Sequence, residues 1–168
     1  ARGRQPGSGL RAPCLAGRRR RKLPIIAARA MPALLVVAHA PLASSLCAVA
    51  QHVYPECGSG LAALDVEPGM TPEEAAALMR ALLGASEALI LVDVFGATPC
   101  NAALEVADGV SVRVVAGVNV PMLWRTLCYA ALPLDQLVER AVSGGGQGVM
   151  QVGTARRQHP EQADGAQA

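Results

Sequence analysis

The stretch ALILVDVFGATPCN, residues 88–101, decides how this chain is expected to fold. Its apolar first half lacks polar alternation, which is typical of a strand buried on both faces of a sheet. Its second half has the pattern of a helix start, with Thr98 as the N-cap and Pro99 at the first helical position. Asp93 and Gly96 lie between the two halves. Because helix N-termini offer free N–H groups and the positive end of a dipole, this junction predicts a site for an anion such as a phosphate.

Strand and helix patterns alternate on both sides of this stretch. Apolar runs predict strands at 33–38, 61–66, 88–93 and 110–116, with a short last strand at 148–152. Helical spacing predicts helices at 41–54, 72–83, 99–107 and 121–129, and another from Pro133 that the glycines of 144–148 end. The clearest helix start is Thr71, where Glu74 completes a capping box. The alternation indicates an α/β fold with a doubly wound, mostly parallel sheet of four to five strands and helices on both faces.

The charge of the chain is unevenly distributed. Nine of the 15 basic residues precede Met31, and no acidic residue does. From Met31 onward, six basic residues stand against 13 acidic ones, a net charge of −7. An acidic domain with only 2% aromatic residues argues against nucleic acid as a partner. No apolar run approaches the roughly 20 residues that a membrane span needs, so we expect no insertion into a membrane.

The two ends of the chain differ in composition from the rest. Residues 1–30 are rich in Arg, Gly and Pro, which predicts a disordered basic extension upstream of a native start at Met31. An alternative is a secretory signal, with residues 38–40 as the cleavage site. Arg29, inside the apolar part of that signal, argues against it, and we expect a cytoplasmic protein. The folded domain is then 31–152, and 153–168 is a polar, disordered tail.

Several kinds of site lack their sequence signatures. The five cysteines are scattered and form no C-x-x-C pair, which argues against structural zinc and against a disulfide framework. The chain has no P-loop, G-x-G-x-x-G, G-x-S-x-G or H-E-x-x-H motif, so nucleotide-binding, hydrolase and zinc-protease interpretations lack support. His39 and Asp93 alone are too few ligands for a metal. We therefore expect neither a metal nor a cofactor.

His39 and Asp93 each follow a predicted buried strand. Parallel strands present their carboxyl ends at one edge of a sheet, where ligands bind at the topological switch point. A carboxylate that accepts a hydrogen bond from Nδ1–H fixes the imidazole tautomer and leaves Nε2 as a nucleophile. The backbone around Gly96 and Ala97, with the Thr98 hydroxyl, is then in place to hold phosphoryl oxygens. These parts suffice for a phosphohistidine relay.

Four motifs carry a family resemblance. In order, they are VVAHAPLA (36–43), LDVEPG (64–69), LVDVFGATPCNAA (91–103) and GVNVPML (117–123). Together they resemble the mannose-family IIA domain of the bacterial sugar phosphotransferase system over residues 31–152. Because all four occur in the family's order, the resemblance is more specific than any one motif.

The resemblance implies a phosphotransferase in which His39 is phosphorylated and Asp93 is its partner. The phosphoryl group would come from the carrier protein HPr and pass to a separate IIB protein. Asn119 and Met122 would lie near the site and shape the docking surface. The family also implies a cytoplasmic homodimer, often with an exchanged C-terminal strand, for which Val149–Val152 is the candidate here.

Some residues depart from the family pattern. Ala38 and Ala40 replace the common Thr and Gly around the histidine, and Gly-Ala-Thr-Pro (96–99) replaces Gly-Gly-Ser-Pro. These changes could alter the rate of transfer or the choice of partner. Three alternative functions also stay open. Phosphorylation could serve regulation instead of sugar transport, with the phosphorylation state read by a partner protein. The domain could bind a partner or small molecule without catalysis. It could also be a phosphoryl donor subunit of a dihydroxyacetone kinase.

Overall fold

The computed structural model describes residues 31–153. The expected basic extension (1–30) and nearly all of the expected tail (153–168) lie outside the described residues. Within them, a four-stranded sheet has the order β2-β1-β3-β4, and all three strand pairs are parallel. The strands are β1 (Ala33–His39), β2 (Leu61–Val66), β3 (Ala88–Val92) and β4 (Val112–Ala116). The predicted α/β class and parallel sheet are confirmed.

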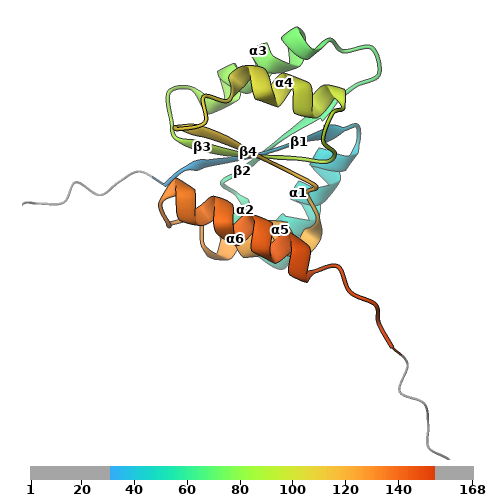
Figure 1. Cartoon of the computed structure of the whole chain (residues 1–168), viewed down its shortest axis with the longest axis vertical. Helices are drawn as coiled ribbons and strands as arrows, with labels where there is room; N and C mark the ends of the chain where they lie inside the picture. The colour runs from blue at the N-terminus through green and yellow to red at the C-terminus, as the bar shows by residue number, and fades with distance from the viewer. Residues whose placement is uncertain (1–30, 154–168) are drawn as a thin grey trace, which may run out of the picture.

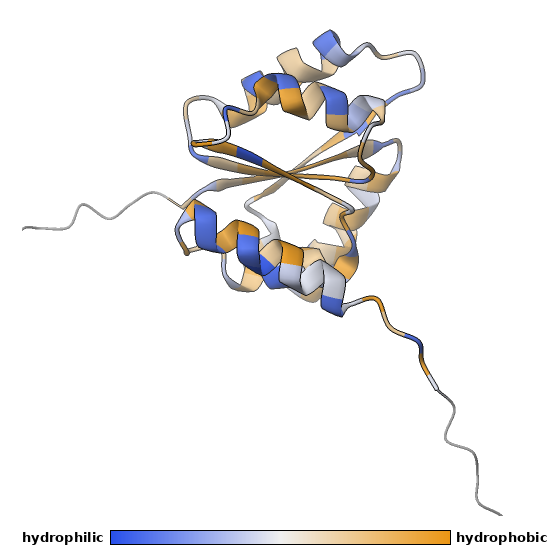
Figure 2. Cartoon of the chain, viewed as in Figure 1, coloured by the Kyte–Doolittle hydropathy of each residue, from blue (hydrophilic) through white to orange (hydrophobic). Residues whose placement is uncertain are grey.

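Helices cover both faces of the sheet (Figure 1). One face carries α3 (Pro72–Leu83) and α4 (Thr98–Val106). The other carries α1 (Leu42–Val53), the short α2 (Pro55–Gly58), α5 (Val120–Cys128) and α6 (Leu134–Gln147). In Figure 2 the strands between these layers are the most continuously hydrophobic part of the chain. No helix of residues 31–153 is long and apolar enough to cross a membrane.

The two central strands contribute to two separate cores. In β1, Val36 belongs to the core under α1, α5 and α6, whereas its neighbour Val37 belongs to the core under α3 and α4. Leu91 and Val92 of β3 divide in the same way. Because successive strand side chains point to opposite faces, a strand covered on both faces must be apolar throughout. This requirement explains the uninterrupted apolar runs in the sequence.

The strand order places the topological switch point between β1 and β3. From β1 the chain moves to β2 on one side of it, and β3 then lies on the other side of β1. Val37 of β1 pairs with Val92 of β3, so the two strands end beside each other. His39 closes β1 and Asp93 directly follows β3.

Helix α6 corrects one sequence prediction. We expected the glycines of 144–148 to end this helix, but it runs through Gly146 to Gln147. These glycines allow α5 to approach closely: a Cβ atom on Gly144 would lie 2.5 Å from Arg125 Cβ, and one on Gly145 would lie 2.6 Å from Met122 Cε. The packing of α5 on α6 thus outweighs the weak helix propensity of glycine.

Two element starts also differ from prediction. Helix α4 begins at Thr98 and its N-cap is Ala97, so Thr98 is not the cap and no side chain caps this helix. Strand β4 begins at Val112, not at 110, because Asp108 Oδ1 accepts hydrogen bonds from the N–H groups of Val110, Ser111 and Val112 and holds them in a turn. The predicted capping box of α3 is confirmed, with both reciprocal hydrogen bonds between Thr71 and Glu74.

The predicted last strand at 148–152 is absent from the described part of the chain. After α6, the backbone of residues 149–153 has no regular structure. Val149, Met150 and Val152 are exposed there, at 70–84% of their surface. Without a neighbouring strand, an apolar run of this length has no hydrogen-bonding partner in the monomer.

Candidate functional site

The site forms where β1 and β3 end. His39 Nδ1 lies 2.6 Å from Asp93 Oδ2, across 54 positions of the chain. The same carboxylate oxygen accepts the backbone N–H of His39 at 3.0 Å. The other oxygen, Oδ1, accepts the N–H of Val94 at 2.8 Å. The contact predicted between the two side chains is therefore present, and it is anchored by two backbone hydrogen bonds.

Asp93 carries a charge in this environment. Its side chain is only 10% exposed. Burial acts to raise the pKa of this carboxyl group, but hydrogen bonds from the backbone and ring of His39 and from the N–H of Val94 outweigh it, and the pKa lies below its usual value. Asp93 is therefore a carboxylate at neutral pH, and both of its oxygens act only as acceptors.

This carboxylate sets the tautomer of His39. Because Asp93 Oδ2 can only accept, Nδ1 of the ring must carry the hydrogen that joins them. In the neutral imidazole the lone pair then lies on Nε2. The side chain of His39 is 54% exposed, so the ring is open to an incoming protein. The arrangement presents a fixed, accessible nitrogen nucleophile.

The floor of the site is a small hollow beside the ring. It has a volume of about 210 Å³, and His39 and Thr98 both line it, together with the segment 66–70, which begins at the last residue of β2. Thr98 occupies the first turn of α4, a turn that contains no acidic residue. Gly96, with φ of +85°, shapes the turn that leads to Ala97, the N-cap. The structure thus brings Thr98 to the same hollow as His39, and the 96–97 segment directly precedes it.

Asn119 and Met122 stabilise the start of α5 and its packing. Asn119 is the N-cap of α5: its Oδ1 accepts the N–H of Met122 at 2.9 Å, and its Nδ2 donates to the carbonyl of Gly145 at 3.2 Å. Met122 is 4% exposed and belongs to the core. A buried side chain is not available to a docking protein, so Met122 can affect docking only through the position of α5.

Sequence reasoning missed other residues at this edge. Val94 and Phe95 follow Asp93 and are 50% and 78% exposed, which gives the site an apolar rim. The only signal was an apolar pair placed after the end of a strand and before a glycine. Asp65 was also missed: its Oδ1 accepts the N–H of Ser44 at 3.1 Å, which ties the start of α1 to β2.

No group of three or more His, Cys, Asp or Glu side chains within 31–153 could hold a metal ion.

The chain is similar to a known protein family. A family model described as "PTS system fructose IIA component" matches residues 33–142. No curated protein matches the chain.

Solved structures of similar fold come from several bacteria. A mannose/sorbose-specific IIA subunit from Enterococcus faecalis shares 24% identity at a TM-score of 0.69, over 76% of this chain and 98% of its own. A PTS IIA protein associated with the fucose utilization operon of Streptococcus pneumoniae shares 25% at 0.57, over 69% and 92%. The EIIA component of Streptococcus agalactiae shares 17% at 0.66, over 72% and 97%.

Proposed function

The chain belongs to the fructose IIA component family of the bacterial sugar phosphotransferase system (PTS), and we propose that it is a phosphocarrier whose His39 accepts a phosphoryl group from HPr and passes it to a IIB protein. The observation that carries this proposal is the 2.6 Å contact between His39 Nδ1 and Asp93 Oδ2. That contact leaves Nε2 as the nucleophile and keeps the ring in one orientation.

The proposed transfer is a displacement at phosphorus. The lone pair of His39 Nε2 attacks the phosphorus of the phosphohistidine on HPr and forms a new P–N bond. The P–N bond of the donor breaks, and its electron pair returns to the donor imidazole. The positive charge that develops on the His39 ring is stabilised by Asp93, which retains its hydrogen bond to Nδ1–H. Transfer to the IIB protein follows the same steps, with His39 as the leaving group.

Phosphoryl transfer depends mostly on positioning and on neutralising charge on the phosphoryl oxygens. In our proposal these oxygens bind at the start of α4, to backbone N–H groups of the segment Gly96 to Thr98 and to the Thr98 hydroxyl. Support comes from the hollow that Thr98 and His39 share and from the absence of an acidic residue in the first turn of α4. The helix dipole adds a favourable field for an anion there.

The docking surface for HPr is proposed to include the apolar rim at Val94 and Phe95. Exposed apolar side chains beside a reactive group are typical of a protein-binding patch. We also propose that the protein acts as a homodimer, as the family resemblance implies.

Phosphorylation in a defined mixture tests the function. The full chain is incubated with enzyme I, HPr and phosphoenolpyruvate, and acid-labile phosphate is mapped by mass spectrometry under alkaline conditions. We expect one phosphate on His39, none in His39→Gln, and normal labelling in the control His52→Gln, which changes an exposed histidine on α1. A labelled His39→Gln protein would refute the assignment of the site, and an unlabelled wild-type chain would refute the function.

A further inference from the structure

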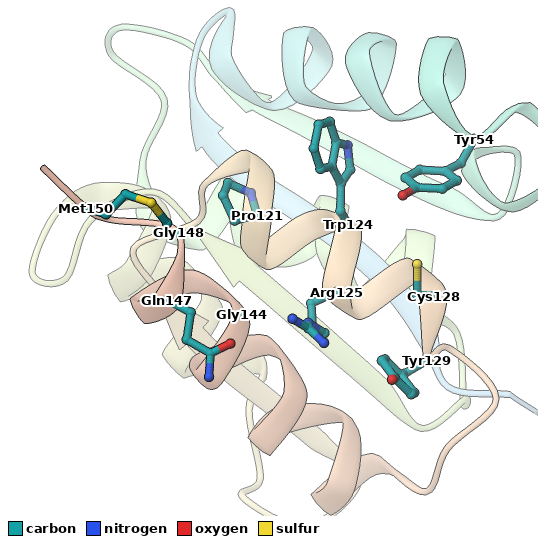
Figure 3. A pocket seen from close by; sticks show the side chains of 10 residues that line it. All are labelled: Tyr54, Pro121, Trp124, Arg125, Cys128, Tyr129, Gly144, Gln147, Gly148 and Met150. Atoms are coloured by element: carbon teal, nitrogen blue, oxygen red, sulfur yellow. The ribbon is translucent and has the colours of Figure 1, made fainter. Parts of the chain in front are cut away.

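A second cavity shares no lining residue with the hollow beside His39. It has a volume of about 690 Å³ and lies between the end of α1, helix α5 and the C-terminal end of α6. Figure 3 shows the side chains that line it: Tyr54 and Trp124 lie on one side of α5, and Arg125 and Tyr129 lie on the other. Small organic ligands occupy cavities in this range of volumes. We call it the aromatic cavity.

The aromatic residues of the chain are concentrated here. The whole sequence contains one Trp, two Tyr and one Phe. Three of these four residues, Tyr54, Trp124 and Tyr129, line the aromatic cavity. The rings of Tyr54 and Trp124 are in an edge-to-face arrangement, with centroids 6.2 Å apart. Because neither core cluster of the described residues contains an aromatic side chain, these rings do not serve to fill the cores. They provide flat apolar surfaces in a wall of the cavity.

The aromatic cavity is also a positive site in an acidic domain. Residues 31–153 contain four arginines and eleven acidic residues, and none of the acidic residues lines the cavity. Arg80 donates to the carbonyl of Glu105, and Arg113 pairs with Asp135. The guanidinium of Arg140 lies 4.9 Å from the centroid of the Tyr129 ring. Arg125 lines the cavity, and its guanidinium makes no ion pair within the described residues.

The indole of Trp124 adds an unsatisfied donor to this wall. Its Nε1 atom is buried and has no hydrogen-bond partner within residues 31–153. Buried N–H groups in folded proteins nearly always have a partner. This atom has almost no accessible surface, so a ligand would reach it only if the Tyr54 and Trp124 rings moved apart.

We propose that the aromatic cavity binds a small organic anion with a flat ring. Its carboxylate or phosphate would pair with Arg125, whose planar guanidinium suits either group, and its ring would lie against Tyr129, four residues further along the chain and on the same side of α5. Two sources share this chemistry, a nucleoside monophosphate and a simple aryl carboxylate. The proposal does not depend on phosphorylation of His39.

The single tryptophan gives a direct readout. Emission of Trp124 in the full chain, excited at 295 nm, is titrated with AMP, benzoate, adenosine and inorganic phosphate. We expect saturable quenching by AMP, by benzoate or by both, which identifies the source. Adenosine lacks the charge and inorganic phosphate lacks the ring, so each should need at least ~10-fold higher concentration. Equal responses to all four probes, or no saturable response to AMP and benzoate, overturn the proposal.

Single-residue variants test whether the ligand binds in the aromatic cavity. Arg125→Gln keeps the carbons that pack on Gly144 and should weaken binding by at least ~10-fold. Arg80→Gln removes the same charge from α3 and should leave binding unchanged. If Arg125→Gln does not fold by circular dichroism, Tyr129→Leu decides, because it removes an exposed ring and should also weaken binding. Unchanged binding in the folded variant, or a Trp124 signal that follows protein concentration because a second copy covers the cavity, contradicts the proposal.

Discussion

At the scale of single residues, one oxygen atom fixes the position of the reactive side chain. Asp93 Oδ2 accepts hydrogen bonds from both the backbone N–H and the ring Nδ1 of His39, at 3.0 and 2.6 Å. The Asp93 carboxylate thereby fixes the imidazole ring of His39 relative to the backbone of the same residue. A mobile imidazole would have to be realigned each time a partner protein bound. Holding the reacting atoms in alignment lowers the activation barrier of such transfers.

Asp93→Asn should slow phosphorylation of His39 by about 10³- to 10⁴-fold, because an amide can donate to Nδ1 and stabilise the wrong tautomer. Rapid-quench measurement of transfer from phosphorylated HPr gives the rate. Asp135→Asn is the matched control, since that side chain is 83% exposed on α6 and contacts Arg113 instead of His39. A wild-type rate in Asp93→Asn would remove Asp93 from the mechanism.

Thiol reactivity should distinguish the cysteines of the described chain. Burial, and secondarily the charge of Asp65, raise the pKa of the Cys47 thiol to about 11. Because the thiolate is the reactive form, Cys47 should stay unmodified by iodoacetamide at pH 8 while the exposed Cys57 and Cys128 are alkylated. Peptide mass spectrometry measures the extent at each position. Modification of Cys47 as fast as Cys57 would contradict the buried position of this thiol.

At the scale of elements, the start of α3 could be predicted from the sequence, whereas the end of α6 could not. The capping box of α3 follows from a local pattern, Thr71 with Glu74, and the structure confirms it. The end of α6 depends on contacts with another element: Gly144 and Gly145 stay helical because α5 packs directly on them. No pattern within 144–148 carries that information. Thr98 was misassigned for a related reason, since its side chain lines the hollow at His39 instead of capping α4.

The two threonines at helix starts should differ in their effect on stability. Thr71→Ala removes a side-chain cap and should lower the free energy of unfolding by about 1 kcal/mol. Thr98→Ala removes no cap hydrogen bond and should change it by less than ~0.5 kcal/mol. Urea denaturation of both variants measures the difference. Equal losses would show that Thr98 does cap α4.

The glycines of α6 offer a second matched pair. Gly144→Ala places a methyl group 2.5 Å from Arg125 Cβ, an atom attached directly to the α5 backbone, and should destabilise the domain by about 1–3 kcal/mol. Gly146→Ala meets nothing within 4 Å and should stabilise the helix by up to ~1 kcal/mol. Thermal and urea denaturation report both changes. A neutral Gly144→Ala would mean that α5 and α6 are not closely packed in solution.

At the scale of the whole molecule, the sequence determined the class of fold and the edge that carries the site. The apolar runs at β1 and β3 are long enough to identify strands covered on both faces, and strand ends in a parallel sheet meet at one edge. This logic placed His39 beside Asp93. The same reasoning could not predict the aromatic cavity. Its lining residues Tyr54, Trp124 and Tyr129 come together only because the end of α1 packs near α5. The strand predicted at 148–152 is absent from the described residues, because none of the four strands of the sheet pairs with this segment.

Both cores of the domain are built from residues 34–141. A chain that starts at Met31 should therefore have the same melting temperature as the full chain, within about 2 °C, and the same rate of His39 phosphorylation. Circular dichroism and the labelling assay make the comparison. A clearly lower melting temperature would show that residues 1–30 contribute to the fold.

The position of the phosphoryl group on the His39 ring is the most direct test of the account. ³¹P nuclear magnetic resonance of the alkaline-denatured phosphoprotein distinguishes phosphate on Nε2 from phosphate on Nδ1. Because Asp93 occupies Nδ1, we expect the Nε2 isomer alone. Phosphate on Nδ1, or a phosphorylated protein in which His39 is unmodified, would contradict the central claim.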